Sequence, residues 1–120
     1  MIHPGSCFMA NYPTHAHLHI VVSDVTETSV TVVFVSSVKE GREYDDACVL
    51  NKGDHPFIAH KSYIVYDKFQ HYKKKDLEWS IKMGEFTVEP DVSQSVLERI
   101  RDGAKKSDYL SKFDKETFFK

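Results

Sequence analysis

A run of β-branched and aromatic residues is the sequence feature that most constrains how this chain can fold. The segment Ser29–Ser37 reads Ser-Val-Thr-Val-Val-Phe-Val-Ser-Ser, and such side chains favour an extended backbone. Because its apolar residues are nearly continuous, the segment predicts a central strand that is covered on both faces. The rest of the chain must then supply neighbouring strands and the layers that cover them.

The preceding stretch, His15–Asp24, predicts the strand that pairs with this central one. Its residues alternate with the two-residue period of a strand. One face is expected to carry His15, His17 and His19, and the other to carry Ala16, Leu18, Ile20 and Val22. Because only a short polar connection separates the two segments, we expect an antiparallel hairpin.

Further segments predict additional strands and one late helix. Short strands are expected at Cys7–Ala10, Ala47–Leu50 and Ser62–Phe69. Leu77–Met83 fits either a strand or a helical turn, whereas a helix is expected from an N-cap at Asp91 or Ser93 to a C-cap at Gly103. The order predicts a mainly β fold over residues 1–104, a small bent sheet or partly open barrel closed by that helix.

The C-terminal residues 105–120 alternate lysines and acids with several aromatic side chains. A bare solvated tail does not need so many aromatic residues. We therefore expect a second short helix, or a segment that docks on the body of the protein or on a partner chain.

Composition limits the classes of function. A chain of 120 residues with a formal net charge of −2 fits one domain and has no overall field that attracts a phosphate backbone. The two cysteines, Cys7 and Cys48, do not form a disulfide framework, so reduced thiols and the cytoplasm are expected. The start of the chain lacks the pattern of a signal peptide, and no apolar run approaches the roughly 20 residues that cross a bilayer, so no membrane contact is expected.

Motifs of several enzyme classes are absent from the sequence. No Gly-x-Ser-x-Gly turn is present, and Gly41, Gly53 and Gly84 stand alone rather than in a phosphate-binding loop. These absences argue against a serine hydrolase of that type and against an NTPase. The lysine run Lys73–Lys75 predicts a solvated turn.

The three histidines of the alternating strand raise the question of a metal site. Two imidazoles at this spacing can reach one metal ion, and His55 or His60 could add a further ligand. The outer side chains of a straight strand diverge, however, so three ligands rarely come from one strand. We expect no metal or other cofactor, and a metal-binding protein remains the second alternative.

Acid–base catalysis is the remaining interpretation of the histidine strand. His17 can act as an acid or a base near neutral pH, and the hydroxyls of Ser36 and Ser37 end the strand that should lie beside it. With a cation nearby, such a set suits cleavage of RNA without metal, in which a base removes the 2′-hydroxyl proton and donors hold the phosphate.

The order of elements resembles the MazF/PemK family of toxin endoribonucleases. Four segments carry this resemblance: His17–Ser23, Phe34–Ser37, His60–Ile64 and Met83–Phe86 with the helix that follows. They are similar to the family's Arg-Pro-hydrophobic-Val-Ile-Ser, Pro-Leu-Thr-Ser, Leu-x-x-Asp-Ser and Ile-Gly-x-Leu patterns, respectively. The resemblance extends over roughly Cys7–Arg101.

The resemblance implies an SH3-like bent β-barrel that forms a homodimer, cuts single-stranded RNA without metal and is restrained by a small antitoxin protein. It assigns the family's catalytic arginine to His17 and its threonine to Ser36. Since histidine cannot form a bidentate fork to phosphate, Arg42 or Lys61 is expected to supply the cation. The other candidate substrate-binding residues are His15, His19, Ser37 and Ser62.

A different class of function stays open beside the nuclease. Because the family's arginine is replaced, the same fold could serve as a catalytically inactive module that binds a protein partner. Its contacts would come from the groove or from the aromatic tail, with Phe113, Phe118 and Phe119.

Overall fold

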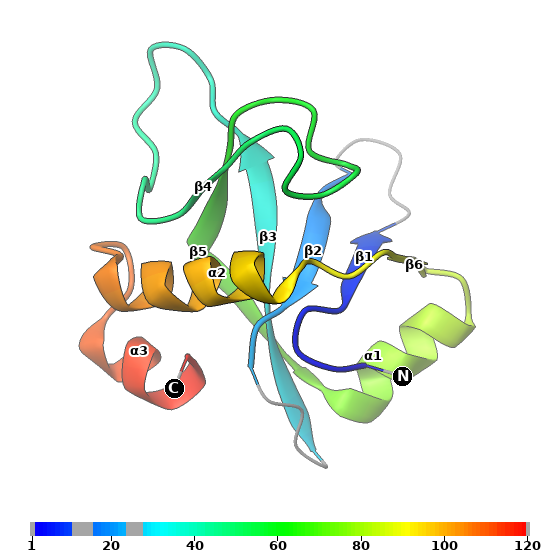
Figure 1. Cartoon of the computed structure of the whole chain (residues 1–120). Helices are drawn as coiled ribbons and strands as arrows, with labels where there is room; N and C mark the ends of the chain where they lie inside the picture. The colour runs from blue at the N-terminus through cyan, green and yellow to red at the C-terminus, as the bar shows by residue number, and fades with distance from the viewer. Residues whose placement is uncertain (1, 11–15, 24–27, 120) are drawn as a thin grey trace.

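The computed structural model of the chain describes residues 2–10, 16–23 and 28–119, which form one β-sheet with helices packed on it (Figure 1). The strands are β1 (Cys7–Ala10), β2 (Leu18–Val21), β3 (Ser29–Ser37), β4 (Val49–Leu50), β5 (Ser62–Lys73) and β6 (Phe86–Glu89). The helices are α1 (Lys74–Lys82), α2 (Gln94–Lys106) and α3 (Lys112–Phe118). The expectation of a mainly β fold is confirmed.

All six strands belong to one antiparallel sheet with the order β4-β5-β3-β2-β1-β6. The strand β3 lies inside the sheet, and its residues Val30–Val33 are all buried, so the expectation of a central strand covered on both faces is confirmed. The predicted hairpin is also present, because His19 pairs with Phe34 and Val21 with Val32 in antiparallel register.

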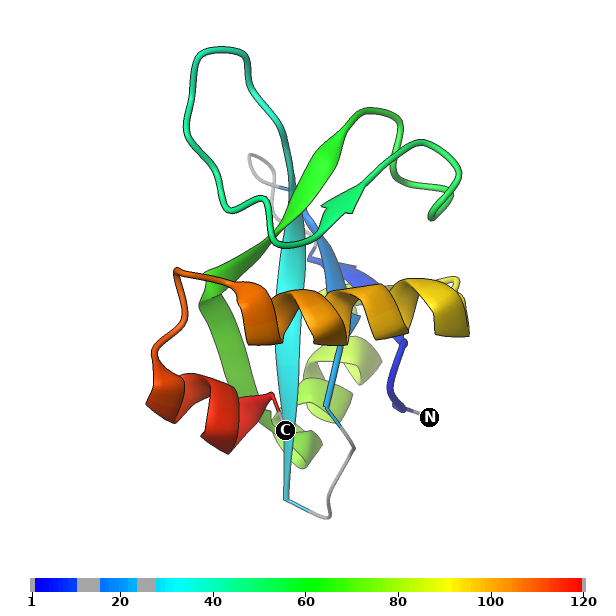
Figure 2. The ribbon, with the colours of Figure 1, turned by 60° about the vertical axis from the view of Figure 1, so that its left-hand side comes forward.

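The sheet curls into a half-barrel because the pairing register between its two longest strands, β3 and β5, shifts partway along them. Between the pairs Val32–Gln70 and Phe34–Val65, β3 advances by two residues while β5 advances by five. The extra residues form a large bulge in β5, and bulges bend and twist a strand. Figure 2 shows the resulting curvature, with β5 crossing β3 at a steep angle.

The concave face of the sheet packs against α2, and we call it the α2 face (Figure 1). Leu18, Ile20 and Val33 contribute from the sheet and Leu97 and Ile100 from the helix to one buried cluster. As predicted, Ser93 caps α2 by accepting a hydrogen bond from the Val96 amide. This amphipathic helix thus closes the half-barrel.

Gly103 lies inside α2, and the expectation that it ends the helix is wrong. The helix continues to Lys106, and its C-cap is Ser107. Gly103 faces the sheet, where an added Cβ atom would overlap the Tyr66 hydroxyl and lie 2.8 Å from Cys48 Cβ. The glycine therefore permits close approach of helix and sheet rather than a left-handed turn.

The opposite face of the sheet, which we call the histidine face, is partly covered by α1. Leu77 of this helix is fully buried against Phe8, Val21 and Val30. The lysine run that was expected to be a solvated turn instead begins α1, because Asp76 in its first turn and buried Leu77 favour a helix there. No described helix is long and apolar enough to cross a membrane.

The C-terminal segment folds back on the body of the protein. Ser111 caps α3, and Phe119 beyond it is only 9% exposed in the core of the α2 face. The Phe118 ring lies 5.0 Å from that of Phe69, whereas Phe113 remains 68% exposed. Two of the three tail phenylalanines thus contribute to the fold.

Candidate functional site

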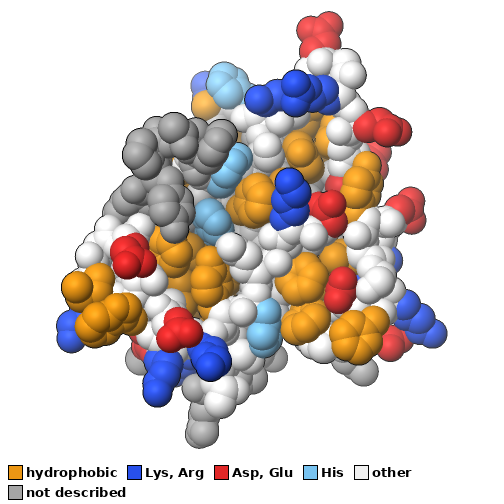
Figure 3. All heavy atoms as spheres, turned by 180° about the vertical axis from the view of Figure 1, so that it is seen from behind, with side chains coloured by type: hydrophobic (Ala, Val, Ile, Leu, Met, Phe, Trp, Pro, Cys, Tyr) orange, Lys and Arg blue, Asp and Glu red, His pale blue; other side chains and the backbone are white. Residues whose placement is uncertain are grey.

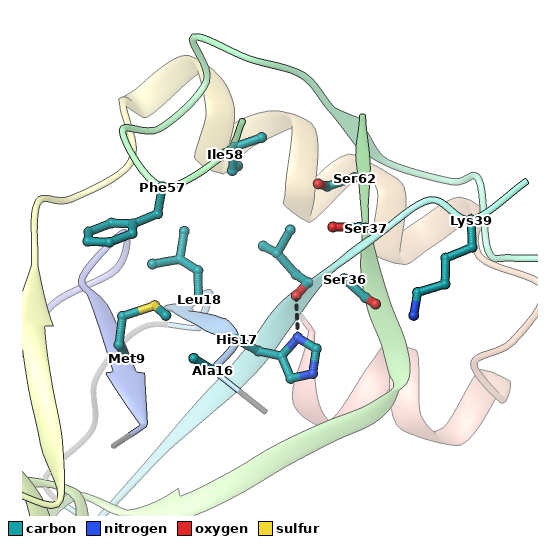
Figure 4. A pocket seen from close by; sticks show the side chains of 11 residues that line it. Met9, Ala16, His17, Leu18, Ser36, Ser37, Lys39, Phe57, Ile58 and Ser62 are labelled. Atoms are coloured by element: carbon teal, nitrogen blue, oxygen red, sulfur yellow. Dashed lines mark hydrogen bonds between the residues drawn. The ribbon is translucent and has the colours of Figure 1, made fainter. Parts of the chain in front are cut away.

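A pocket of about 380 Å³ lies where β3 ends and β2 and β5 begin, below the two long loops of residues 38–48 and 51–61. Figure 4 shows its lining, in which polar side chains gather on one side and apolar ones on the other. The lining residues are Met9, Ala16, His17, Leu18, Val35, Ser36, Ser37, Lys39, Phe57, Ile58 and Ser62.

The polar side of this pocket contains four of the predicted site residues. His17 directly precedes β2, Ser36 and Ser37 come from the end of β3, and Ser62 occupies the first position of β5. The strand register explains why these four side chains lie together. Ser37 of β3 is paired with Ser62 of β5, and β2 is the other neighbour of β3. Antiparallel pairing therefore assembles at one end of the sheet residues that are up to 45 positions apart in sequence.

The ring of His17 is held in a defined orientation. Its Nδ1–H group donates a hydrogen bond to the carbonyl oxygen of Val35 at 3.0 Å, and its ring centre lies 4.9 Å from that of Phe34. Since a carbonyl oxygen can only accept, Nδ1 carries the proton and Nε2 is the basic nitrogen of the neutral ring. This arrangement is suited to proton transfer at Nε2.

The cation of the pocket is Lys39, which the sequence analysis did not select. Its side chain lines the pocket, and Figure 4 shows it on the same side as Ser36 and His17. The two expected cations, Arg42 and Lys61, are exposed and are not among the lining residues. One signal could have indicated Lys39, namely its position only two residues after the end of β3.

The hydroxyl groups differ in their hydrogen bonds. Ser62 Oγ donates to the carbonyl oxygen of His60 at 2.8 Å, so its proton is already used in a hydrogen bond to the backbone. Ser36 is half-buried and Ser37 exposed. Hydroxyl donors beside an ammonium group are the type of set that holds a phosphate.

The apolar side of the pocket is built by Phe57 and Ile58 from the second loop. The Phe57 amide donates to Nδ1 of His55, and His55 Nε2–H donates to the carbonyl oxygen of Pro90. Both ring nitrogens of this buried histidine are thus used to hold the loop, so His55 does not provide the further metal ligand that its type suggested. Phe57 is 52% exposed, so its aromatic ring is accessible at the rim of the pocket.

His19 does not share this pocket. It lies two positions further along β2, in a second pocket of about 160 Å³ on the histidine face. Its Nδ1–H donates to the carbonyl oxygen of His17 at 2.8 Å, and its ring stacks on Phe8 at 5.1 Å. Burial lowers the pKa of His19, despite the opposing effect of that hydrogen bond.

The metal hypothesis gains no support from the described residues. Three or more histidine, cysteine or acidic side chains come together nowhere in residues 2–10, 16–23 and 28–119 in an arrangement that could hold a metal ion. His17 and His19 each use Nδ1 toward a backbone carbonyl. His15, the remaining member of the predicted triplet and a candidate substrate-binding residue, lies outside the described residues.

The two cysteines are buried and reduced and do not line the main pocket. Burial raises the pKa of Cys7 to about 12 and also raises the pKa of Cys48. A thiol becomes a strong nucleophile only as thiolate. Neither residue has the properties of a catalytic nucleophile at neutral pH.

Comparison of the chain with protein-family models, with curated proteins and with solved structures finds no match.

Proposed function

We propose that this protein is a metal-independent endoribonuclease that acts on single-stranded RNA. The observation that carries the proposal is the common pocket of His17, Ser36 and Lys39, in which a base of defined tautomer lies beside a hydroxyl donor and a cation. These are the groups that transfer of a phosphoryl group to an adjacent 2′-hydroxyl needs.

In this mechanism, His17 Nε2 removes the proton of the 2′-hydroxyl, and the resulting oxygen attacks the neighbouring phosphorus. The bond from phosphorus to the 5′ oxygen of the next nucleotide breaks. Lys39 neutralises the developing charge on the phosphoryl oxygens and delivers a proton to the leaving oxygen, while Ser36 and Ser37 donate hydrogen bonds to the phosphate. The products are a 2′,3′-cyclic phosphate and a 5′-hydroxyl group.

The curled sheet with its closing helix supports the further proposal of an SH3-like, MazF/PemK-like barrel. The resemblance of His17–Ser23 and Phe34–Ser37 to the family's patterns falls on the strands β2 and β3 that line the pocket. By the same resemblance we propose a cytoplasmic homodimer that is restrained by a small antitoxin-like protein. In this account Lys39 replaces the positive charge that the family's arginine supplies.

Cleavage of labelled single-stranded RNA by the purified full chain in EDTA tests the proposal. We expect His17→Ala to slow cleavage by roughly 100-fold or more, as loss of a general acid or base does. His60→Ala is the matched control, because His60 is exposed and outside the pocket lining. Absence of cleavage by the natural protein, or equal rates for natural protein and His17→Ala, contradicts the proposal.

A second set of variants examines the cation. Lys39→Gln should lose most of the activity, whereas Lys39→Arg should keep part of it, because arginine retains the positive charge. If instead Arg42→Gln or Lys61→Gln abolishes cleavage while Lys39→Gln does not, the assignment of the cation is wrong.

An inactive interaction module is the second candidate function. The observation in its favour is the exposed aromatic surface of the tail, where Phe113 and Tyr109 lie at the surface although Phe118 and Phe119 are packed inward. EDTA-insensitive cleavage of RNA that depends on His17 rules out the inactive module.

A further inference from the structure

A row of aromatic rings leads away from the main pocket across the histidine face. The row consists of His17, Phe34, His19, Phe8 and Phe86, and we call it the aromatic row. Successive ring centres are 4.9, 5.7, 5.1 and 4.8 Å apart. Figure 3 views this face and shows histidine side chains among hydrophobic ones at its centre.

Strand register produces this row. Phe34 of β3 is paired with His19 of β2, His19 is paired with Phe8 of β1, and Phe86 of β6 is paired with Ala10 beside it. Four neighbouring strands thus contribute rings on one face. The helix α1 covers the other end of this face through Leu77, which belongs to the same buried cluster as Phe8 and Phe86.

The second pocket lies along this row and adds hydrogen-bonding groups to it. It is lined by Ala10, His17, His19, Phe34, Gln70, Tyr72 and Phe86. The Tyr72 hydroxyl donates to Gln70 Oε1 at 2.7 Å, which orients the amide of Gln70. Gln70 is exposed, so its side-chain amide is accessible in the same pocket as the half-buried rings of Phe34 and His19.

His17 joins the two pockets, because it lines both of them. A ligand that places a phosphate near Ser36 and Lys39 can therefore extend past His17 onto the aromatic row without leaving the protein surface. Burial lowers the pKa of His19, which favours the neutral form of the ring that stacks on Phe8.

We infer that the second pocket binds an unpaired nucleobase of the nucleotide whose phosphate lies in the main pocket. The base stacks on the rings of Phe34 and His19, and the amide of Gln70 hydrogen-bonds to its edge. Stacking on aromatic side chains together with contacts to base edges is the usual way in which proteins recognise single-stranded RNA. This inference rests on the proposed nuclease function, since it uses the same RNA strand.

Binding of a fluorescein-labelled single-stranded DNA oligonucleotide, measured by anisotropy, tests the inference. DNA lacks the 2′-hydroxyl and cannot undergo the proposed cleavage, so binding is measured separately from catalysis. We expect Gln70→Ala and Phe34→Leu each to weaken binding by roughly five-fold or more, the effect of losing one stacking or edge contact. Phe113→Leu is the control, because this exposed residue lines neither the main pocket nor the second pocket, and it should leave the affinity unchanged.

The variants separate this inference from the proposed function. Gln70→Ala alters an exposed side chain and is expected to fold, and a thermal melt checks Phe34→Leu. If the natural protein cleaves RNA but both variants bind DNA as the natural protein does, the base site is wrong and the nuclease proposal stands. If the variants lose binding while the natural protein fails to cleave RNA, the base site is supported and the nuclease proposal is wrong.

Discussion

Substitution of Gly103 by alanine should destabilise the protein, although alanine is the better helix former. In an exposed helix position this change gains about 1 kcal/mol. Here the added Cβ atom would overlap the Tyr66 hydroxyl and lie 2.8 Å from Cys48 Cβ and 3.0 Å from the Ala47 carbonyl oxygen. The latter two atoms belong to or adjoin the backbone and have little freedom to move away.

The expected magnitude follows from two destabilising contributions and one stabilising contribution. Overpacking of a dense core costs about 1–3 kcal/mol. Moving Tyr66 also breaks its 2.6 Å hydrogen bond to the Ile100 carbonyl oxygen, which costs about 1–3 kcal/mol in a buried site. After the gain in helix propensity, we expect a net loss of about 3 kcal/mol in the free energy of unfolding.

Urea denaturation followed by circular dichroism measures this loss. Ser95→Ala, at an exposed position of α2, is the matched control and should be neutral or slightly stabilising. Tyr66→Phe removes the first overlapping atom, so Gly103→Ala should cost less in that background. A Gly103→Ala protein as stable as the natural one would refute the close approach of α2 to the sheet.

Three further predictions concern buried titratable and polar groups. Because burial raises the pKa of Cys7 to about 12, stability should fall as pH rises from about 9 toward 12, and Cys7→Ala should reduce that fall in urea titrations; an unchanged pH dependence contradicts the assignment. Because the pKa of His19 is lowered, stability should fall as pH drops below about 6.5, and His19→Phe should reduce the difference between pH 7.5 and pH 5. The Ser107 hydroxyl donates to buried Asp45, so Ser107→Ala should cost about 1–3 kcal/mol in the same assay, and a neutral effect would refute this anchor.

Local patterns predicted the strands and a bent sheet, but not the position at which the sheet bends. The run Ser29–Ser37 and the alternation before it depend on neighbouring residues in sequence, and both strands and their hairpin are present. The bulge of β5 opposite Val32–Phe34 depends on packing between distant segments, and no local signal indicates it. The same reason explains Gly103, whose role is set by Tyr66 and Cys48 rather than by its helix neighbours.

The candidate site was predictable where strand alternation determines it. His17 directly precedes β2, Ser36 lies on the neighbouring strand β3, and the two residues share the pocket, as the hairpin implies. His19 follows two positions later, about 6.6 Å along the strand, and therefore lies in a different pocket. Lys39 was missed because its direction depends on how the chain leaves β3, which composition does not determine.

Attack by a 2′-hydroxyl fixes the chemical ends that cleavage leaves on the RNA, and mass spectrometry of the fragments identifies those ends. After digestion of single-stranded RNA in EDTA by the natural protein, we expect fragments with 2′,3′-cyclic phosphate and 5′-hydroxyl ends. We also expect that 2′-O-methylated RNA resists cleavage and that His17→Ala yields almost no fragments. Fragments with 5′-phosphate ends, or cleavage of the 2′-O-methylated strand, would contradict attack by a 2′-hydroxyl in the His17 pocket.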